Sequence, residues 1–176
     1  IVPFDGPADV YIVNTCTVTN IADRKSRQML HRARQMNPDA VVVAVGCYVQ
    51  TGREAVEKDE SIDLAVGNNR KKDIAEILET YLAERQDKTL QGRTIPDIGS
   101  THEYEEMQLR QTSEHTRAYI KIQDGCNQFC SYCVIPYARG RVRSRRMEDV
   151  LREVRGMAEA GYREAVLTGI HLSSYG

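Results

Sequence analysis

The sequence lacks the features of a membrane or secreted protein. It has no run approaching the roughly 20 apolar residues that a membrane-spanning helix needs. Its start has no charged region followed by an apolar one. The cysteines number five, and an odd count in a reducing compartment favours a metal or cluster role over disulfide bonds. We therefore expect a cytoplasmic protein without a membrane partner.

The sequence also lacks an initial Met, and it stops at Gly176 shortly after an apolar segment. We expect from this a piece of a longer protein. Its 176 residues, 41% of them apolar, are enough for one large domain or two small ones.

The net charge is only −1, but acidic and basic residues are distributed unevenly along the chain. Residues 51–116 carry 9 Lys/Arg against 15 Asp/Glu, whereas residues 117–176 carry 10 against 6. Basic charge is therefore concentrated in the last third of the chain.

Three of the five cysteines lie within a stretch of eight residues inside that basic region. Cys126, Cys130 and Cys133 have the spacing C-x3-C-x2-C, which is too irregular for one face of a strand or helix and indicates a loop. Such a triad can hold three irons of a 4Fe-4S cluster, with Gly125 letting the backbone come close. The fourth iron would then be open to a small molecule.

Two other interpretations of the triad stay open. A structural zinc site prefers paired C-x2-C knuckles with four ligands, and no cysteine or histidine in the next residues completes such a set. The three thiols could also be uncoordinated.

The first half of the chain alternates strand and helix patterns, which predicts an open parallel α/β sheet. Asn20 is the expected cap of the first helix, because Asp23 follows three residues later. The expected strands are 9–14, 40–46 and 62–66, and the expected helices are 20–36, 53–58 and 74–82.

The remaining two cysteines each follow one of these strands. Cys16 comes two residues after the first strand and Cys47 directly after the second. Ligands of open α/β sheets gather at the carboxyl ends of strands, so we expect both thiols at the same rim. The alternative is two unrelated small apolar residues, since free cysteine is often buried.

A second β-α-β unit follows the first domain. The pattern predicts a strand at 118–122, a helix at 147–158 and a strand at 165–168. We expect a first domain over residues 1–86, a polar linker with one extended segment over 87–116, and a second domain over 117–176.

The cysteine loop is followed by five arginines with no acid among residues 139–146. Such a run is usually a solvated face, but guanidinium groups beside a cluster loop can also hold phosphates. With the basic helix 20–36 they could flank an RNA. The candidate RNA-binding residues are Arg24, Lys25, Arg139, Arg141, Arg143 and Arg145.

Longer strings around the cysteines resemble a known family. These strings are 14–19, 22–28, 45–48, 120–126 and 135–145, and they are similar to radical S-adenosylmethionine (SAM) methylthiotransferases. The resemblance is greatest to the branch that acts on threonylcarbamoyladenosine in tRNA. It implies that the second domain begins a partial (β/α) barrel.

The resemblance also implies cofactors and their residues. Cys126, Cys130 and Cys133 would hold a 4Fe-4S cluster whose open iron binds S-adenosylmethionine, and Tyr132 would lie near the adenine. Gly169 would approach the cofactor with its backbone, although a glycine ending a strand is more often a turn. A second 4Fe-4S cluster would use Cys16, Cys47 and an upstream cysteine that this sequence does not contain.

The reaction that the resemblance implies is methylthiolation of carbon 2 of threonylcarbamoyladenosine beside the anticodon. One electron would cleave the cofactor to a radical that takes hydrogen from an unactivated carbon, and no side chain is given a catalytic role. The implied partners are the tRNA anticodon arm and a reducing electron donor protein, and we expect a monomer. The 176 residues alone are expected to be inactive.

Other functions remain open at this point. The chain could act on another tRNA adenosine or on a ribosomal protein, or it could be a non-catalytic metal-binding RNA module. An electron-transfer iron-sulfur protein is a further alternative, but it usually calls for a fourth cysteine.

Overall fold

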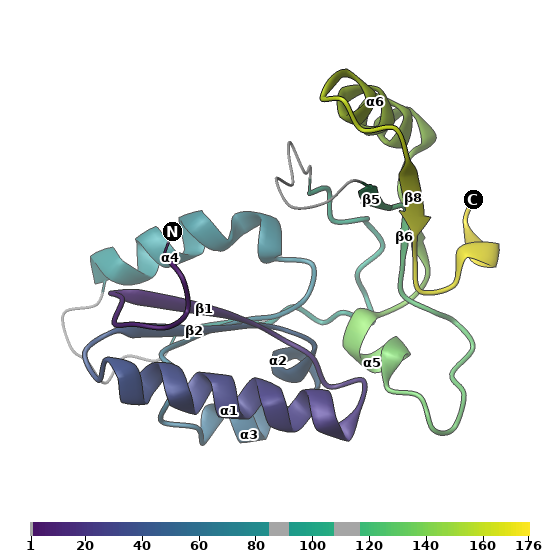
Figure 1. Cartoon of the computed structure of the whole chain (residues 1–176). Helices are drawn as coiled ribbons and strands as arrows, with labels where there is room; N and C mark the ends of the chain where they lie inside the picture. Colours follow the sequence, from purple (N-terminus) through teal and green to yellow (C-terminus); the bar gives the residue numbers. More distant parts are fainter. Residues whose placement is uncertain (1, 85–91, 108–116) are drawn as a thin grey trace.

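The computed structural model describes residues 2–84, 92–107 and 117–176 (Figure 1). The first part is a four-stranded sheet in which neighbouring strands pair in parallel, in the order β1-β2-β3-β4. The predicted parallel α/β sheet is therefore confirmed. The strands are β1 (Val10–Thr15), β2 (Val41–Gly46), β3 (Leu64–Val66) and β4 (Gly92–Thr94).

Alternation along β2 builds two cores, one on each face of the sheet. Val42 and Ala44 pack with Leu30 in one core, and Val43 and Val45 pack in the other. Successive side chains of a strand point to opposite faces, so an apolar strand can fill both layers. The covering elements are α1 (Asn20–Met36), α2 (Cys47–Thr51), α3 (Arg53–Glu57), the 3-10 turn η1 (Lys71–Asp73) and α4 (Ile74–Glu84).

The cap of α1 is Thr19, not Asn20 as predicted. Thr19 has an extended backbone, and its side-chain oxygen accepts a hydrogen bond from Ala22 N at 3.1 Å. Asp23 accepts instead from the hydroxyl of Thr17 at 2.8 Å. Either Thr or Asn can cap a helix, and the neighbouring Thr19 has the geometry that reaches the free N–H group.

The second part of the chain contains the predicted β-α-β unit. β5 (Ala118–Lys121) pairs in parallel with β8 (Ala165–Thr168), and α6 (Met147–Glu159) lies between them in sequence and packs on β5. Four further elements were not predicted and lie around the cysteine loop or after β8. They are the antiparallel pair β6 (Gln123–Asp124) and β7 (Arg143–Ser144), the helix α5 (Ile135–Arg139), and the 3-10 turn η2 (Leu172–Ser174).

One face of this small sheet is covered and the other is exposed. Ala118 and Ile120 of β5 pack with Val150 and Met157 of α6. On the opposite face Tyr119 of β5 stays 50% exposed, whereas Leu167 of β8 pairs with Ile120 on the covered face and is 45% exposed. This small sheet therefore leaves large apolar side chains exposed to solvent.

The segment between the two parts contributes to the first sheet. Strand β4 pairs with β3, so residues 92–94 extend the first domain beyond the boundary at 86 that we predicted. They also supply the extended segment expected within 87–116. Residues 87–91 and 108–116 of the predicted linker lie outside the described residues. Across the ranges that are described, no helix is both long and apolar enough to cross a bilayer.

Candidate metal centre

The cysteine triad lies on the loop that connects β6 to α5. Cys126 N donates to the carbonyl of Gly140 at 3.1 Å, and Cys133 N donates to the carbonyl of Cys130 at 2.9 Å. All three thiols are free: Cys130 is exposed, and Cys126 and Cys133 are partly exposed. The loop thus presents three reactive sulfurs to an incoming metal or cluster.

The arrangement of the thiols bears on the kind of metal. Within the described residues, no group of three or more His, Cys, Asp or Glu side chains could hold one metal ion. A single zinc with bonds of about 2.3 Å to sulfur needs its ligands gathered around one point. An iron-sulfur cube takes each thiolate on a different iron, so its ligands lie farther apart. Three thiols on one loop are donors of the kind that an iron-sulfur cluster takes.

Gly125 permits the close approach that shapes this loop. Its φ is +73°, and a Cβ there would lie 1.9 Å from the carbonyl oxygen of Arg141. Only glycine has both the left-handed conformation and the space at this point. The returning chain at residues 140–141 is thereby held against the start of the triad.

Cys16 and Cys47 lie at the carboxyl ends of β1 and β2, as predicted. The parallel register pairs Thr15 with Gly46, the residues that precede the two cysteines. Cys16 is partly exposed, and its N–H donates to Ser26 Oγ at 2.9 Å. Cys47 begins α2 and is fully buried.

The two cysteine regions meet where α2 contacts α5, which lie beside each other in Figure 1. Arg139 Nε donates to Cys47 Sγ at 3.1 Å, although the two residues are 92 positions apart. Asn68 Nδ2 donates to the carbonyl of Ala138 at 2.6 Å and lies 3.5 Å from the same sulfur. Cys47 thus lies beside the helix that follows the triad loop.

Positive charge surrounds the junction. Asp124 Oδ2 is 3.0 Å from Lys121 Nζ and 3.7 Å from both Arg139 and Arg143. Burial would raise the pKa of the Asp124 carboxyl, but Lys121 and Arg139 outweigh burial and lower it. Burial would lower the pKa of the Arg139 guanidinium, but Cys47 and Asp124 outweigh burial and raise it. The pKa of Lys71 is lowered by burial and by Arg139.

The two residues that the resemblance assigned to S-adenosylmethionine have different environments. Tyr132 is 91% exposed and extends from the loop. Gly169 follows β8, and a Cβ there would come within 2.8 Å of Leu172 Cδ2 and 2.9 Å of Gln123 Oε1. Internal packing alone is therefore a sufficient reason for glycine at position 169.

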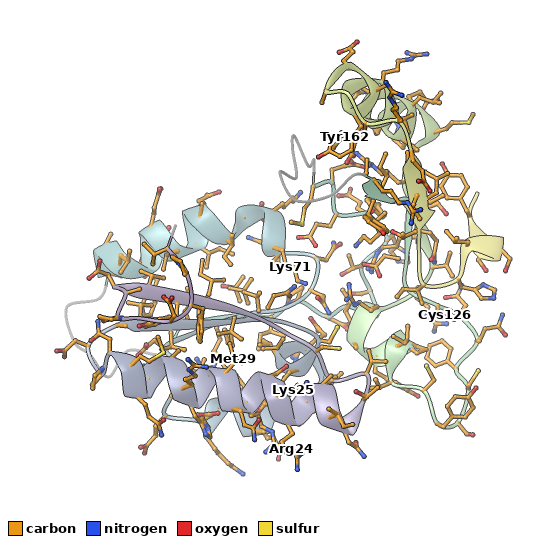
Figure 2. The ribbon with its side chains drawn as sticks, viewed as in Figure 1. Arg24, Lys25, Met29, Lys71, Cys126 and Tyr162 are labelled. Atoms are coloured by element: carbon orange, nitrogen blue, oxygen red, sulfur yellow. The ribbon has the colours of Figure 1, made fainter. Side chains whose placement is uncertain are left out.

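The predicted RNA-binding residues divide into exposed and buried groups. Figure 2 places Arg24 and Lys25 on α1, and both are exposed. Arg141 is also exposed, and its guanidinium lies 4.6 Å from the ring centre of Phe129. These three side chains are accessible to phosphates.

Arg143 and Arg145 are buried, so the structure corrects their assignment to an RNA surface. Each side chain is only 2% exposed. Arg143 lies beside Asp124, and Arg145 pairs with Glu106 at 2.8 Å and with Glu153. The run of arginines resembled a solvated or phosphate-binding face, but alternation in the short β7 segment turns these two side chains inward.

Gln123 is a structural residue of the site that sequence reasoning missed. It is fully buried, and its Nε2 donates to the carbonyls of Asp124 and Gly125 at 2.9 and 2.8 Å. Its Oε1 accepts from His171 N at 2.8 Å. One amide therefore joins the start of the triad loop to the end of β8. The available signal was a polar residue at the end of a strand pattern, two residues before Gly125.

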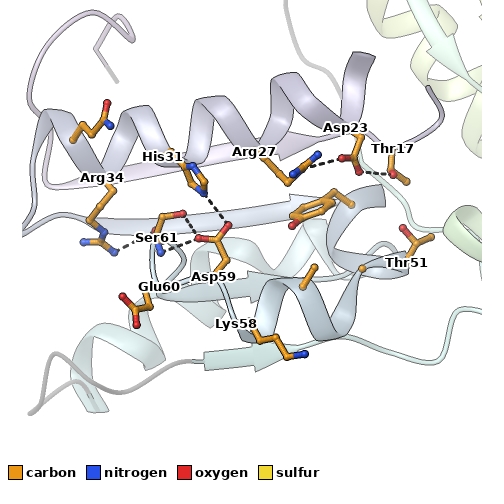
Figure 3. Close-up of a pocket in the computed structure, with 14 residues that line it drawn as sticks. Thr17, Asp23, Arg27, His31, Arg34, Thr51, Lys58, Asp59, Glu60 and Ser61 are labelled. Atoms are coloured by element: carbon orange, nitrogen blue, oxygen red, sulfur yellow. Dashed lines mark hydrogen bonds and ion pairs between the residues drawn. The ribbon is translucent and has the colours of Figure 1, made fainter. Parts of the chain in front are cut away.

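A groove of about 890 Å³ lies elsewhere on the first domain (Figure 3). It runs between α1 and the α2–α3 segment, and its charged side chains pair with one another. Asp23 binds Arg27 at 3.0 Å, and His31 lies 3.3 Å from Asp59. The groove contains none of the five cysteines.

Comparison with family models assigns the two parts of the chain. Residues 120–175 match the radical SAM superfamily, and residues 1–67 match a family described as uncharacterized protein family UPF0004. The two matches fall on the two parts of the chain whose motifs resemble radical SAM methylthiotransferases.

Among curated relatives, the chain is similar to enzymes that add a methylthio group to tRNA. The chain is 44% identical to the threonylcarbamoyladenosine tRNA methylthiotransferase MtaB of Aquifex aeolicus, over 100% of this chain and 42% of that protein. It is 43% identical to MtaB of Bacillus subtilis, over 98% and 38% of the two chains. Identity is 34% to the tRNA-2-methylthio-N(6)-dimethylallyladenosine synthase of Finegoldia magna, over 96% and 36%. The chain thus spans about two fifths of the length of these relatives.

The fold also resembles a solved structure. The radical S-adenosylmethionine methyltransferase TsrM from Kitasatospora setae matches with a TM-score of 0.65 over 97% of this chain and 39% of TsrM. The sequence identity is 19%, so this match supports the α/β fold alone.

Proposed function

We propose that this chain is part of a radical SAM enzyme that adds a methylthio group to carbon 2 of threonylcarbamoyladenosine in tRNA. The observation that carries the proposal is the meeting of the C-x3-C-x2-C loop with Cys47 through Arg139, in a chain 44% identical to an MtaB. The proposed enzyme works as a cytoplasmic monomer and takes its electrons from a donor protein. Isolated residues 1–176 are proposed to be inactive.

The residues proposed for the first cluster are Cys126, Cys130 and Cys133. They fit a 4Fe-4S group because three free thiols lie on one loop, and Gly125 brings the backbone close without a side chain. When bound with S-adenosylmethionine, such a cluster supplies the electron that cleaves the cofactor's carbon–sulfur bond. The loop residues themselves hold the irons and leave one corner without a protein ligand.

The proposed contacts to S-adenosylmethionine are Tyr132 and Gly169. Tyr132 is accessible on the loop, and its ring can pack against an adenine. Gly169 lies at the carboxyl end of β8, where parallel sheets bind their ligands, but its contact with Gln123 explains the glycine equally well.

The proposed second cluster uses Cys16 and Cys47. Their positions at adjacent strand ends and their location beside the triad region fit a second group that delivers sulfur near the first. This sequence supplies two thiols to that site, since its other three cysteines form the triad.

The proposed RNA contacts are Arg24, Lys25 and Arg141, with a contribution from Arg139, which is partly exposed. Arginine and lysine neutralise phosphates independently of sequence, and an anticodon loop presents unstacked bases. Arg141 over the ring of Phe129 adds a flat surface on which a base can stack. The anticodon arm is therefore the proposed partner.

One observation points to a second candidate substrate, dimethylallyladenosine in tRNA. Relatives that are 34% identical carry the name tRNA-2-methylthio-N(6)-dimethylallyladenosine synthase. The identities of 44% and 43% to the MtaB proteins of Aquifex aeolicus and Bacillus subtilis favour threonylcarbamoyladenosine over dimethylallyladenosine.

The test is anaerobic reconstitution of the chain with iron and sulfide, followed by electron paramagnetic resonance of the reduced sample. We expect a 4Fe-4S signal that changes when S-adenosylmethionine is added. Cys130→Ala should abolish this cofactor-dependent change, whereas Cys47→Ala should leave it in place. A protein that binds zinc but forms no cluster would contradict the proposal.

A further inference from the structure

Three consecutive residues at the end of α5 connect the two cysteine regions. The carbonyl of Ala138 accepts from Asn68 at 2.6 Å, Arg139 bonds to Cys47 Sγ at 3.1 Å, and the carbonyl of Gly140 accepts from Cys126 N at 3.1 Å. The first two bonds reach the amino-terminal domain, and the third reaches the triad loop. Residues 138–140 are therefore the direct link between the two sites.

Arg139 occupies the centre of this link. Its Nε is directed at Cys47, and its Nη1 lies 3.7 Å from Asp124 Oδ2. Asp124 Oδ1 in turn accepts from Gly125 N at 2.9 Å, immediately before the triad. A continuous path of polar contacts thus runs from the buried sulfur of Cys47 to the backbone that begins the triad loop.

The chemistry of this side chain suits such a role. A guanidinium carries several N–H groups in a rigid plane, so it can contact a sulfur and a carboxylate at the same time. Its side chain is only 26% exposed and Cys47 is fully buried, so water screens their interaction weakly. A lysine keeps the charge but lacks the planar fork.

We propose that Arg139 is a positioning residue that holds the sulfur of Cys47 at a fixed place relative to the triad loop. A cation beside a ligand sulfur also stabilises the more negative, reduced form of a cluster, so Arg139 raises the reduction potential at the Cys16–Cys47 site. The positioning role stands on the contacts alone, whereas the effect on potential rests on the proposed function.

The first test uses the metal-free chain and amide hydrogen exchange. Arg139→Met should speed exchange in α2 and at the Cys126 amide by about tenfold or more, because a charged hydrogen bond at a buried junction is lost. Arg146→Met is the matched control, since Arg146 is exposed and pairs with the exposed Glu148 two residues later. Equal exchange in the two variants would overturn the proposal.

Arg139→Lys keeps the positive charge but removes the planar guanidinium, so it tests whether the shape of the side chain matters. It also provides a second variant if the Met variant does not fold. Circular dichroism first establishes that each variant is folded. Lys cannot contact Cys47 and Asp124 together, so exchange in α2 should still be faster than in the parent. If the Lys variant exchanges like the parent, a point charge suffices and the positioning role is wrong.

The second test measures the reduction potential of a cluster in a background with Cys126, Cys130 and Cys133 changed to Ala. Arg139→Met should lower the midpoint potential of that cluster, and Arg139→Lys should restore most of it. An unchanged potential in the Met variant would contradict the effect on potential. If no cluster assembles on Cys16 and Cys47 alone, the effect on potential is wrong for this chain, while hydrogen exchange still decides the positioning role.

Discussion

At the residue scale, the site depends on a few positions where only one side chain fits. Gly125 has a left-handed backbone and no room for a Cβ. The side-chain amide of Gln123 donates to the carbonyl of Gly125 and accepts from the N–H of His171. Arg139 plays a similar part between the domains. These positions carry no metal ligand, yet they decide where the cysteines lie.

Gly125→Ala should destabilise the second domain. The new Cβ would meet the Arg141 carbonyl at 1.9 Å in a conformation that disfavours L-residues, and we expect a loss of about 3 kcal/mol in the free energy of unfolding. Urea denaturation measures this loss.

Gly156→Ala is the control for that substitution. Gly156 lies within α6 and has no atom within 4 Å of a built Cβ, so alanine should stabilise the domain by about 0.5–1 kcal/mol. Equal stability of the two variants would mean that the loop relaxes around the methyl group at position 125.

The positions of the thiols in the fold were easier to predict from the sequence than the side chains around them. The spacing of Cys126, Cys130 and Cys133 and the strand ends at Cys16 and Cys47 are local features, visible in one dimension. The inward orientation of Arg143 and Arg145 was not predictable, because it depends on a two-residue strand and on acids at positions 106, 124 and 153. Contacts over 92 positions, such as that of Arg139 with Cys47, leave no periodic signal.

At the element scale, strong periodicity was predictive and short segments were not. The apolar run of β2 and the amphipathic stripe of α6 both matched their patterns. α5, with five residues, and the paired strands β6 and β7, with two residues each, are too short for a period to show. They are formed by tertiary contacts around the triad.

The start of α1 offers a test at this scale. Thr19→Ala should cost about 1 kcal/mol of stability, because the N–H of Ala22 loses its side-chain acceptor. Asn20→Ala, one residue later, should change stability by less than about 0.5 kcal/mol, since Asn20 is exposed inside the first turn. Thermal unfolding followed by circular dichroism compares the two variants, and a larger loss at Asn20 would favour the cap predicted from sequence.

At the scale of the whole molecule, the proposed function requires basic surfaces on both domains to act together. Arg24 and Lys25 belong to the amino-terminal domain, and Arg141 belongs to the triad region. The domains are joined at α2 and α5, so their relative placement can present these cations to one RNA. Binding to a single continuous surface predicts that cations on either domain affect the same affinity.

We therefore expect Arg24→Gln with Lys25→Gln, and separately Arg141→Gln, to weaken binding of an unmodified tRNA anticodon stem-loop. Each lost phosphate contact should reduce the slope of log affinity against log salt by about 0.7–0.9, because fewer counterions are released. Fluorescence anisotropy at several salt concentrations measures both the affinity and the slope.

Arg32→Gln is the control for Arg141→Gln, because it also removes a single positive charge. Arg32 lies on α1, and its guanidinium is 5.9 Å from the ring centre of Phe4. The substitution removes one positive charge from the chain without touching the proposed surface, so its salt slope should equal that of the parent. If Arg32→Gln weakens binding as much as Arg141→Gln, then the RNA responds to net charge and no defined surface exists. If only the α1 variant weakens binding, the triad region lies outside the interface, and its aromatic and basic side chains serve the cofactor alone.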